Sequence, residues 1–117
     1  MSLVTKIEKE LIYEIALYLL SIALISFLYT ENPPLIFLLI ALIIFGTKIW
    51  YKRRDVIYFL CGAIAGPFAE IICIHFGAWR YFNPTLLGIP IWLPIAWGFV
   101  TVLIMRFAEA ILKTKVK

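Results

Sequence analysis

One acidic residue, Glu70, stands within a long apolar segment and is the best candidate for chemistry in this chain. The segment runs from Val56 to Ala78, and at 1.5 Å per residue Glu70 lies roughly 15 Å before Arg80. An ionised carboxylate at such a depth in a membrane is costly, so we expect Glu70 to be neutral or paired. A neutral carboxyl in apolar surroundings makes Glu70 a candidate catalytic acid. The alternative is an acid that only forms structural hydrogen bonds.

Aromatic and polar residues follow Glu70 at spacings that could form a site with it. Trp97 lies about 10 Å below the start of the last apolar segment, near the level of Glu70. Trp97 and Tyr81 are therefore the other two candidate catalytic residues. The candidate binding residues are Ser21, His75, Trp79, Arg80, Asn83, Trp92 and Thr101. Several of these aromatic residues also fit an aromatic belt at the membrane surface, which is the structural alternative.

Small residues recur on the same helical stripe as Glu70 and predict close helix packing. Gly62 and Gly66 form a GxxxG pair, and Gly77 continues the series. Pro67 predicts a kink just before Glu70, because proline removes one helical hydrogen bond. Pro94 is expected to distort the last helix in the same way.

Composition predicts the elements that must position these residues. The chain has 117 residues, of which 64% are hydrophobic, and its mean hydropathy is +1.01. A small soluble domain cannot bury so much apolar surface, so lipid is the expected solvent. Four continuous apolar segments are long enough to cross a bilayer as helices. They are residues 11–29, 35–51, 56–78 and 91–112. We therefore expect an all-α integral membrane protein, a four-helix antiparallel bundle forming one transmembrane domain over residues 1–117.

The basic residues predict the orientation of these spans. With four spans, only Arg80 of the 11 Lys and Arg residues falls on the side opposite the termini. Positive charge is enriched on the cytoplasmic side, so both termini are expected there, in the plasma membrane. Short basic clusters beside apolar segments argue against a nucleic-acid partner and make membrane lipids the expected partners.

The remaining ionisable and metal-ligating residues have plainer interpretations. Glu14 lies at the predicted level of Lys48, and Glu109 shares the last turns with Arg106, so both are expected to form interfacial ion pairs. His75 has no second ligand at helical spacing. The two cysteines have no companion ligand either, so no metal site or cofactor is expected.

Part of the chain resembles a known membrane family. The residues concerned are Ala69-Glu70, then Gly77 to Tyr81, then Leu87 to Trp97 with its Gly-Ile-Pro and Pro-Ile-Ala-Trp segments. This pattern, over residues 69–97, resembles the carotenoid hydratases of the bacterioruberin pathway. The present chain is shorter, has fewer spans and carries Trp79 in a different local context.

The resemblance implies an isoprenoid substrate that enters sideways from the bilayer. Glu70 would protonate a double bond, and the ring faces of Trp97, Trp92 or Tyr81 would stabilise the cation while water adds. Two other functions stay open from the sequence. One is a membrane subunit or homo-oligomeric scaffold that packs through Gly62 and Gly66, and the other is a small proton-coupled transporter that uses Glu70.

Overall fold

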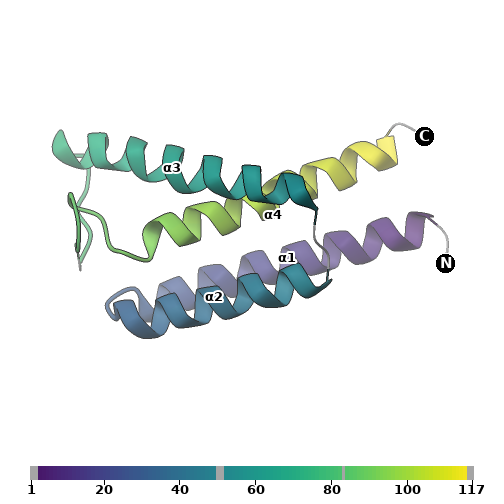
Figure 1. The fold of residues 1–117 in the computed structure, drawn as a ribbon, viewed down its shortest axis with the longest axis horizontal. Coiled ribbons are helices and arrows are strands. Elements are labelled where there is room, and N and C mark those ends of the chain that lie inside the picture. The colour runs from purple at the N-terminus through teal and green to yellow at the C-terminus, as the bar shows by residue number, and fades with distance from the viewer. Residues whose placement is uncertain (1–2, 50–51, 83, 116–117) are drawn as a thin grey trace.

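The chain forms four helices in the computed structural model, which describes residues 3–49, 52–82 and 84–115 (Figure 1). They are α1 (Leu3–Leu28), α2 (Asn32–Ile49), α3 (Arg53–His75) and α4 (Leu93–Lys115). The expected all-α fold is confirmed. By length and composition, three helices can cross a membrane, over Glu8–Leu28, Arg53–His75 and Leu93–Lys113. The apolar part of α2, Asn32–Lys48, is shorter.

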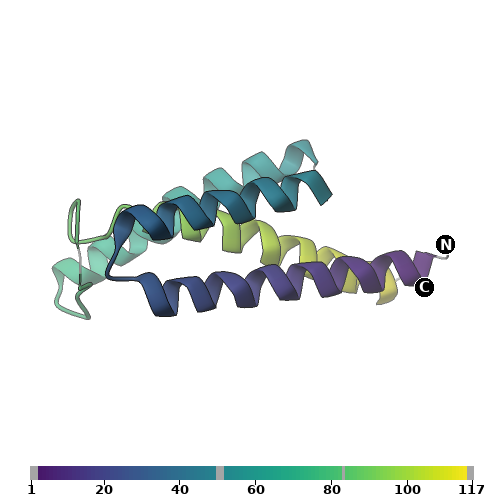
Figure 2. The ribbon, with the colours of Figure 1, turned by 90° about the horizontal axis from the view of Figure 1, so that it is seen from below.

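Helix α4 is the central element of the fold. It packs against α3 most extensively, then against α1 and, over a smaller area, against α2, which also packs on α1. Within the described ranges, the backbones of α2 and α3 do not pack closely against each other although the two helices are consecutive. Both ends of the chain lie at the same end of the elongated molecule (Figures 1 and 2). We call this the basic end and the opposite one, formed by residues 29–32 and 76–92, the aromatic end.

Asp55 caps the start of helix α3. Asp55, its third residue, accepts a hydrogen bond from the backbone N–H of Lys52 at 3.0 Å. A carboxylate there satisfies an amide that lacks a helical partner and also complements the positive end of the helix dipole.

The end of α3 differs from the prediction, because the helix stops at His75 instead of Ala78. Gly77 adopts a φ of +86°, which an L side chain rarely tolerates. The Gly77 N–H donates to the Ile74 carbonyl and the Ala78 N–H donates to the Cys73 carbonyl. These two bonds form a Schellman motif, which ends the helix and reverses the chain.

The start of α4 corrects two further expectations. The helix begins at Leu93, two residues after the predicted start. Pro94 therefore lies in the first turn, where its missing N–H would have no helical partner anyway, and it does not interrupt the helix. Before it, Leu87 and Gly88 both have positive φ, the signature of a tight type I′ turn between Leu86 and Ile89.

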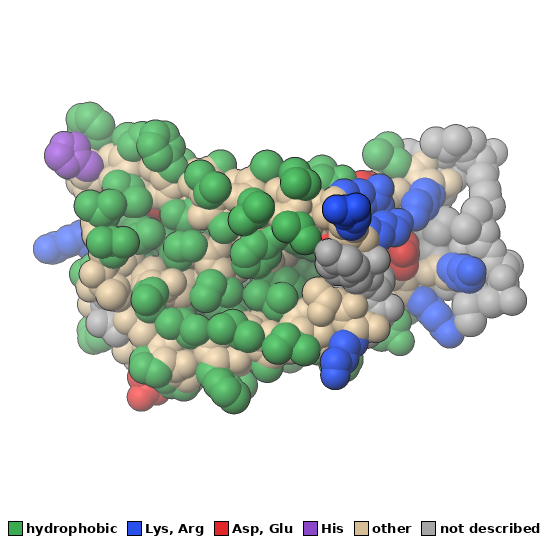
Figure 3. Space-filling view, viewed as in Figure 1, with side chains coloured by type: hydrophobic (Ala, Val, Ile, Leu, Met, Phe, Trp, Pro, Cys, Tyr) green, Lys and Arg blue, Asp and Glu red, His purple; other side chains and the backbone are tan. Residues whose placement is uncertain are grey.

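The buried core has an outer and an inner part. The outer cluster, toward the aromatic end, joins α2 and α4 through Leu35, Leu39, Ile89, Trp92, Leu93 and Ala96. The inner cluster joins α1 to α4 through Leu17, Phe99 and Leu103. On the face shown in Figure 3, hydrophobic side chains cover most of the middle, and Lys and Arg gather toward the basic end. Such a surface suits a lipid environment, in which apolar side chains need no burial.

Candidate functional site

The site is built on close packing between α3 and α4 at Gly66. A Cβ atom added to Gly66 would overlap the indole ring of Trp97. Glu70 follows Gly66 by four residues, so both lie on the same face of α3. An indole lying across Gly66 therefore reaches the Glu70 carboxyl group.

The Glu70 carboxyl receives one hydrogen bond on each oxygen. Trp97 Nε1–H donates to Oε2, and the Tyr81 hydroxyl donates to Oε1. Glu70 is only 9% exposed, and the two donors come from elements that follow α3 in the chain. Two neutral groups therefore hydrogen-bond the Glu70 carboxyl.

Tyr81 reaches Glu70 because the chain reverses after α3. Its ring also packs edge-on against Trp92, with ring centroids 6.2 Å apart and an interplanar angle of 90°. Burial raises the pKa of the Tyr81 hydroxyl, and so does its hydrogen bond to Glu70; a hydrogen bond with the Trp79 side chain acts in the opposite direction. Tyr81 is therefore a neutral phenol that keeps its proton.

An open cavity of about 300 Å³ lies beside these hydrogen bonds. Glu70, Tyr81, Trp92 and Trp97 line it together with apolar side chains, which are Ile25, Leu93, Ala96 and Val100. Trp92 is 3% exposed, and its Nε1–H has no acceptor within the described part of the chain. A buried donor without an acceptor is uncommon and is often a sign of a missing partner.

Contacts with the α1–α2 turn hold the 76–92 segment in place. The Asn32 side-chain amide donates to the Thr85 hydroxyl at 3.0 Å. The rings of Tyr29 and Phe82 meet edge to face with centroids 6.2 Å apart. The segment that carries Tyr81 and Trp92 is thus fixed to both neighbouring helices.

Several predicted site residues lie elsewhere. The Ser21 hydroxyl is buried and donates to the Leu17 carbonyl at 2.9 Å, and the Thr101 hydroxyl donates to the Trp97 carbonyl at 2.7 Å. Neither residue lines the cavity. These two hydroxyls satisfy the backbone of their own helices, as membrane hydroxyls commonly do.

The other predicted binding residues lie on the surface of the aromatic end. His75, Trp79 and Arg80 are exposed and do not line the Glu70 cavity. The His75 ring packs edge-on against Phe76 with centroids 5.4 Å apart. Asn83, the remaining candidate, lies outside the described residues.

The predicted glycine stripe is used within the chain. A Cβ atom at Gly62 would overlap the Thr101 side chain, and one at Gly98 would lie 2.8 Å from the Phe59 ring. Helix α4 thus occupies the Gly62/Gly66 face, which is not exposed for a second copy of the chain. Gly77 has no atom within 4 Å of such a Cβ, so it ends the helix and is not part of the packing stripe.

Ion pairs join α3 and α4 at the basic end, with partners that differ from those expected. Arg106 donates to Asp55 at 2.5 Å. Glu109 pairs with Arg54 at 2.8 Å and accepts from the Tyr58 hydroxyl at 2.7 Å. Partners on adjacent turns of one helix were the expectation, but pairing across the helices is the outcome. These contacts hold together the helix pair that carries Glu70.

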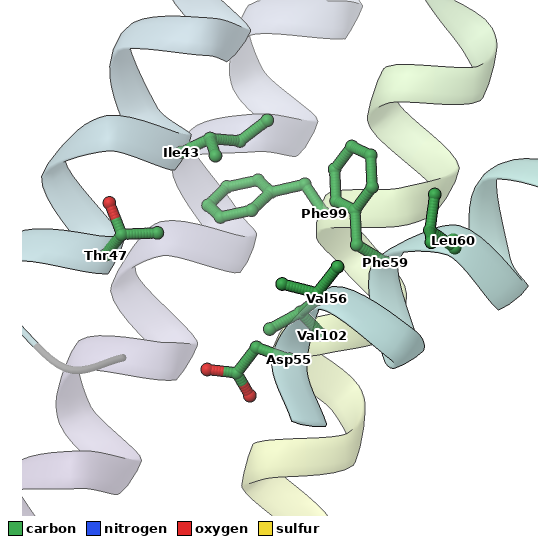
Figure 4. Close-up of a pocket in the computed structure, with 8 residues that line it drawn as sticks. All are labelled: Ile43, Thr47, Asp55, Val56, Phe59, Leu60, Phe99 and Val102. Atoms are coloured by element: carbon green, nitrogen blue, oxygen red, sulfur yellow. The ribbon is translucent and has the colours of Figure 1, made fainter. Parts of the chain in front are cut away.

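A separate cavity of about 240 Å³ lies between α2, α3 and α4 (Figure 4). Figure 4 shows the rings of Phe59 and Phe99 in its middle and the Asp55 carboxyl at one edge, pointing away from them. Its lining is otherwise mostly hydrocarbon, and Asp55 is held by Arg106. A cavity of this kind suits an acyl chain and offers no group for chemistry.

Residues 3–49, 52–82 and 84–115 contain no group of three His, Cys, Asp or Glu side chains that could hold a metal ion. Cys61 and Cys73 are free thiols, the first of them exposed. Comparisons with family models, curated proteins and solved structures find no match to this chain. Its function must therefore be inferred from the geometry around Glu70.

Proposed function

We propose that the protein is a four-span antiparallel bundle in the cytoplasmic membrane, with both termini in the cytoplasm. Three helices have the length and composition of spans. The 18 residues of α2 extend about 27 Å, close to the hydrocarbon thickness of about 30 Å. The concentration of basic residues near the termini supports the orientation. Glu70 then lies in the outer half of the bilayer.

The site around Glu70 is proposed to bind and hydrate a lipid-phase substrate of the isoprenoid class. One observation carries this proposal. A buried carboxyl with a donor on each oxygen lines an open aromatic cavity, in which a buried indole N–H has no acceptor within the described residues. The apolar lining fits an alkene chain, and the Trp92 N–H fits an oxygen atom bound next to it.

The reaction would be the addition of water to a carbon–carbon double bond. Neutral Glu70 gives its proton to one alkene carbon, which leaves a carbocation on the other and a carboxylate on Glu70. The Tyr81 hydroxyl and the Trp97 N–H stabilise that carboxylate, and the aromatic faces stabilise the cation. Water adds to the cation, its proton returns to Glu70, and the Trp92 N–H holds the oxygen of the alcohol product.

The proposal can be tested with the purified protein in nanodiscs. An acyclic polyene and a long-chain isoprenol serve as substrates in ¹⁸O-labelled water, and mass spectrometry follows the gain of one labelled water. We expect product with the wild-type protein and none with Glu70→Gln. Trp92→Phe, which keeps an aromatic ring but removes the N–H, is expected to lower activity at least about tenfold, the equivalent of one hydrogen bond.

The matched control is Phe76→Leu, because Phe76 is an exposed aromatic residue of the same segment and does not line the Glu70 cavity. It should leave activity unchanged. Binding of both substrates without any product would restrict the protein to a carrier or binding role. Binding that is unaffected by Glu70→Gln and Trp92→Phe would contradict the proposed site altogether.

A further inference from the structure

A second buried carboxyl, Glu14 of α1, lies in the basic half of the molecule. It is 2% exposed, and neither carboxyl oxygen has a hydrogen-bond partner among the described residues. The expected ion pair with Lys48 is not formed, and Lys48 is exposed. A buried carboxyl without any donor is costly to maintain, so its environment calls for an explanation.

The charged groups around Glu14 already take part in ion pairs. Its electrostatic neighbours are Glu10 on its own helix and Arg106, Glu109 and Lys113 on α4. Each neighbour has a partner of opposite charge. The pairs are Lys113–Glu10, Arg106–Asp55 and Arg54–Glu109. Glu14 is therefore a surplus carboxyl in a set of charges that otherwise balances.

Glu14 also lines a cavity of about 280 Å³ between α1 and α4. Two aromatic side chains, Tyr18 and Phe107, line the cavity with it, and the rest of the lining is apolar: Ile15, Leu103 and Ile104. A carboxylate next to aromatic rings is a favourable environment for an ammonium group, because both attract positive charge. A primary ammonium would also supply the N–H donors that Glu14 lacks.

An apolar stripe on α4 extends from this cavity toward the aromatic end. Leu103 and Phe107 belong to the same helical face as Val100 and Ala96, which line the Glu70 cavity. From Phe107 to Ala96 this stripe is roughly 16 Å long, enough for an alkyl chain. A head group at Glu14 would thus leave its chain against α4 and toward the lipid.

We propose that the Glu14 cavity is a second binding site, which takes the primary ammonium head of a long-chain amphiphile. The head lies between Glu14, Tyr18 and Phe107, and the alkyl chain lies along the seam between α1 and α4. This site does not depend on the function proposed for Glu70.

The test is equilibrium dialysis of radiolabelled dodecylamine against protein in neutral-lipid nanodiscs, with empty nanodiscs subtracted. We expect saturable binding at one site. Glu14→Gln is expected to weaken it at least about tenfold, because it removes a charge-assisted hydrogen bond. Glu8→Gln is the matched control, since it changes an exposed carboxyl on the same helix. Glu8→Gln and Glu70→Gln should leave the affinity unchanged.

Three outcomes would overturn the proposal. Equal binding to wild type and Glu14→Gln would mean partition into the bilayer. Equally strong, Glu14-dependent binding of dodecanol would mean that the site recognises a hydroxyl and not a cation. Loss of binding in Glu70→Gln would place the amine in the Glu70 site. Because Glu14→Gln replaces a buried carboxyl that has no donor among the described residues, it should fold, and Glu14→Asp, which keeps the carboxyl, should retain part of the affinity.

Discussion

Glu70 and Glu14 are both buried glutamates in apolar helices, yet their surroundings differ. Glu70 has a donor on each oxygen, whereas Glu14 has none within the described residues. The donors of Glu70 come from the 76–92 segment and from α4, which the glycine face of α3 allows to approach closely. Glu14 lies between α1 and α4, in a cavity with mainly apolar walls.

The difference shows that a carboxyl can be buried in an apolar helix bundle either with hydrogen-bond donors or without them. A buried carboxyl whose oxygens accept hydrogen bonds stabilises the fold. A buried carboxyl without a donor lowers stability unless a bound ligand supplies the donor. Substitutions that remove each carboxyl should therefore have opposite effects on stability.

The largest expected effect is that of Glu70→Leu compared with Glu14→Leu. Glu70→Leu leaves two donors without an acceptor at about 1–3 kcal/mol each, so the free energy of unfolding should fall by about 2–6 kcal/mol. Glu14→Leu removes an unpartnered carboxyl and should leave stability unchanged or raise it by about 1 kcal/mol. Unfolding in detergent micelles, followed by far-ultraviolet circular dichroism, measures both. A loss of similar size in the two variants would show that Glu14 has a partner in the folded protein.

A smaller effect is expected from Gly66→Ala. The new methyl group overlaps the Trp97 indole, and such overpacking typically costs about 1–3 kcal/mol. The indole must shift away from Glu70, so tryptophan fluorescence should change. Gly77→Ala is the matched control, because its strain arises from a φ of +86° with no neighbouring atom and should leave the fluorescence unchanged. Dodecylamine binding at Glu14 should survive both changes; its loss in Gly66→Ala would show that the two sites are coupled.

The smallest expected effect concerns pH. Burial and the bond to Glu70 raise the pKa of Tyr81 above its ordinary value of 10.0. A group whose folded-state pKa is raised stabilises the fold fully below its unfolded pKa and loses that contribution as the pH rises through the folded value. Stability should thus begin to fall above pH 10.0, less so in Tyr81→Phe. Tyrosinate absorbance of wild type minus Tyr81→Phe should show one residue that ionises late, and an ordinary titration of Tyr81 would mean that its hydroxyl is exposed.

Much of the Glu70 site could be predicted from the sequence because helical geometry is regular. The distance of Trp97 from the start of its helix followed from the rise per residue, which placed its indole near the level of Glu70. The GxxxG pair predicted a close approach of another helix at Gly66. The same regularity carried a signal for Glu14 that the prediction missed. Glu14, Leu17 and Ser21 repeat at steps of three and four, and all three are buried.

Sequence alone determined the four helices, their approximate limits and the separation of basic from aromatic ends. These features follow from the continuous apolar segments and from the basic clusters beside them, which can be read without knowing any long-range contact. Only the tertiary structure decided which partner each charged side chain takes, as in Arg106 with Asp55 across two helices. It also decided that Tyr81 reaches Glu70 and that Glu14 reaches no donor in the described chain. Such contacts depend on how helices rotate and approach one another, which many side chains determine together and no single spacing encodes.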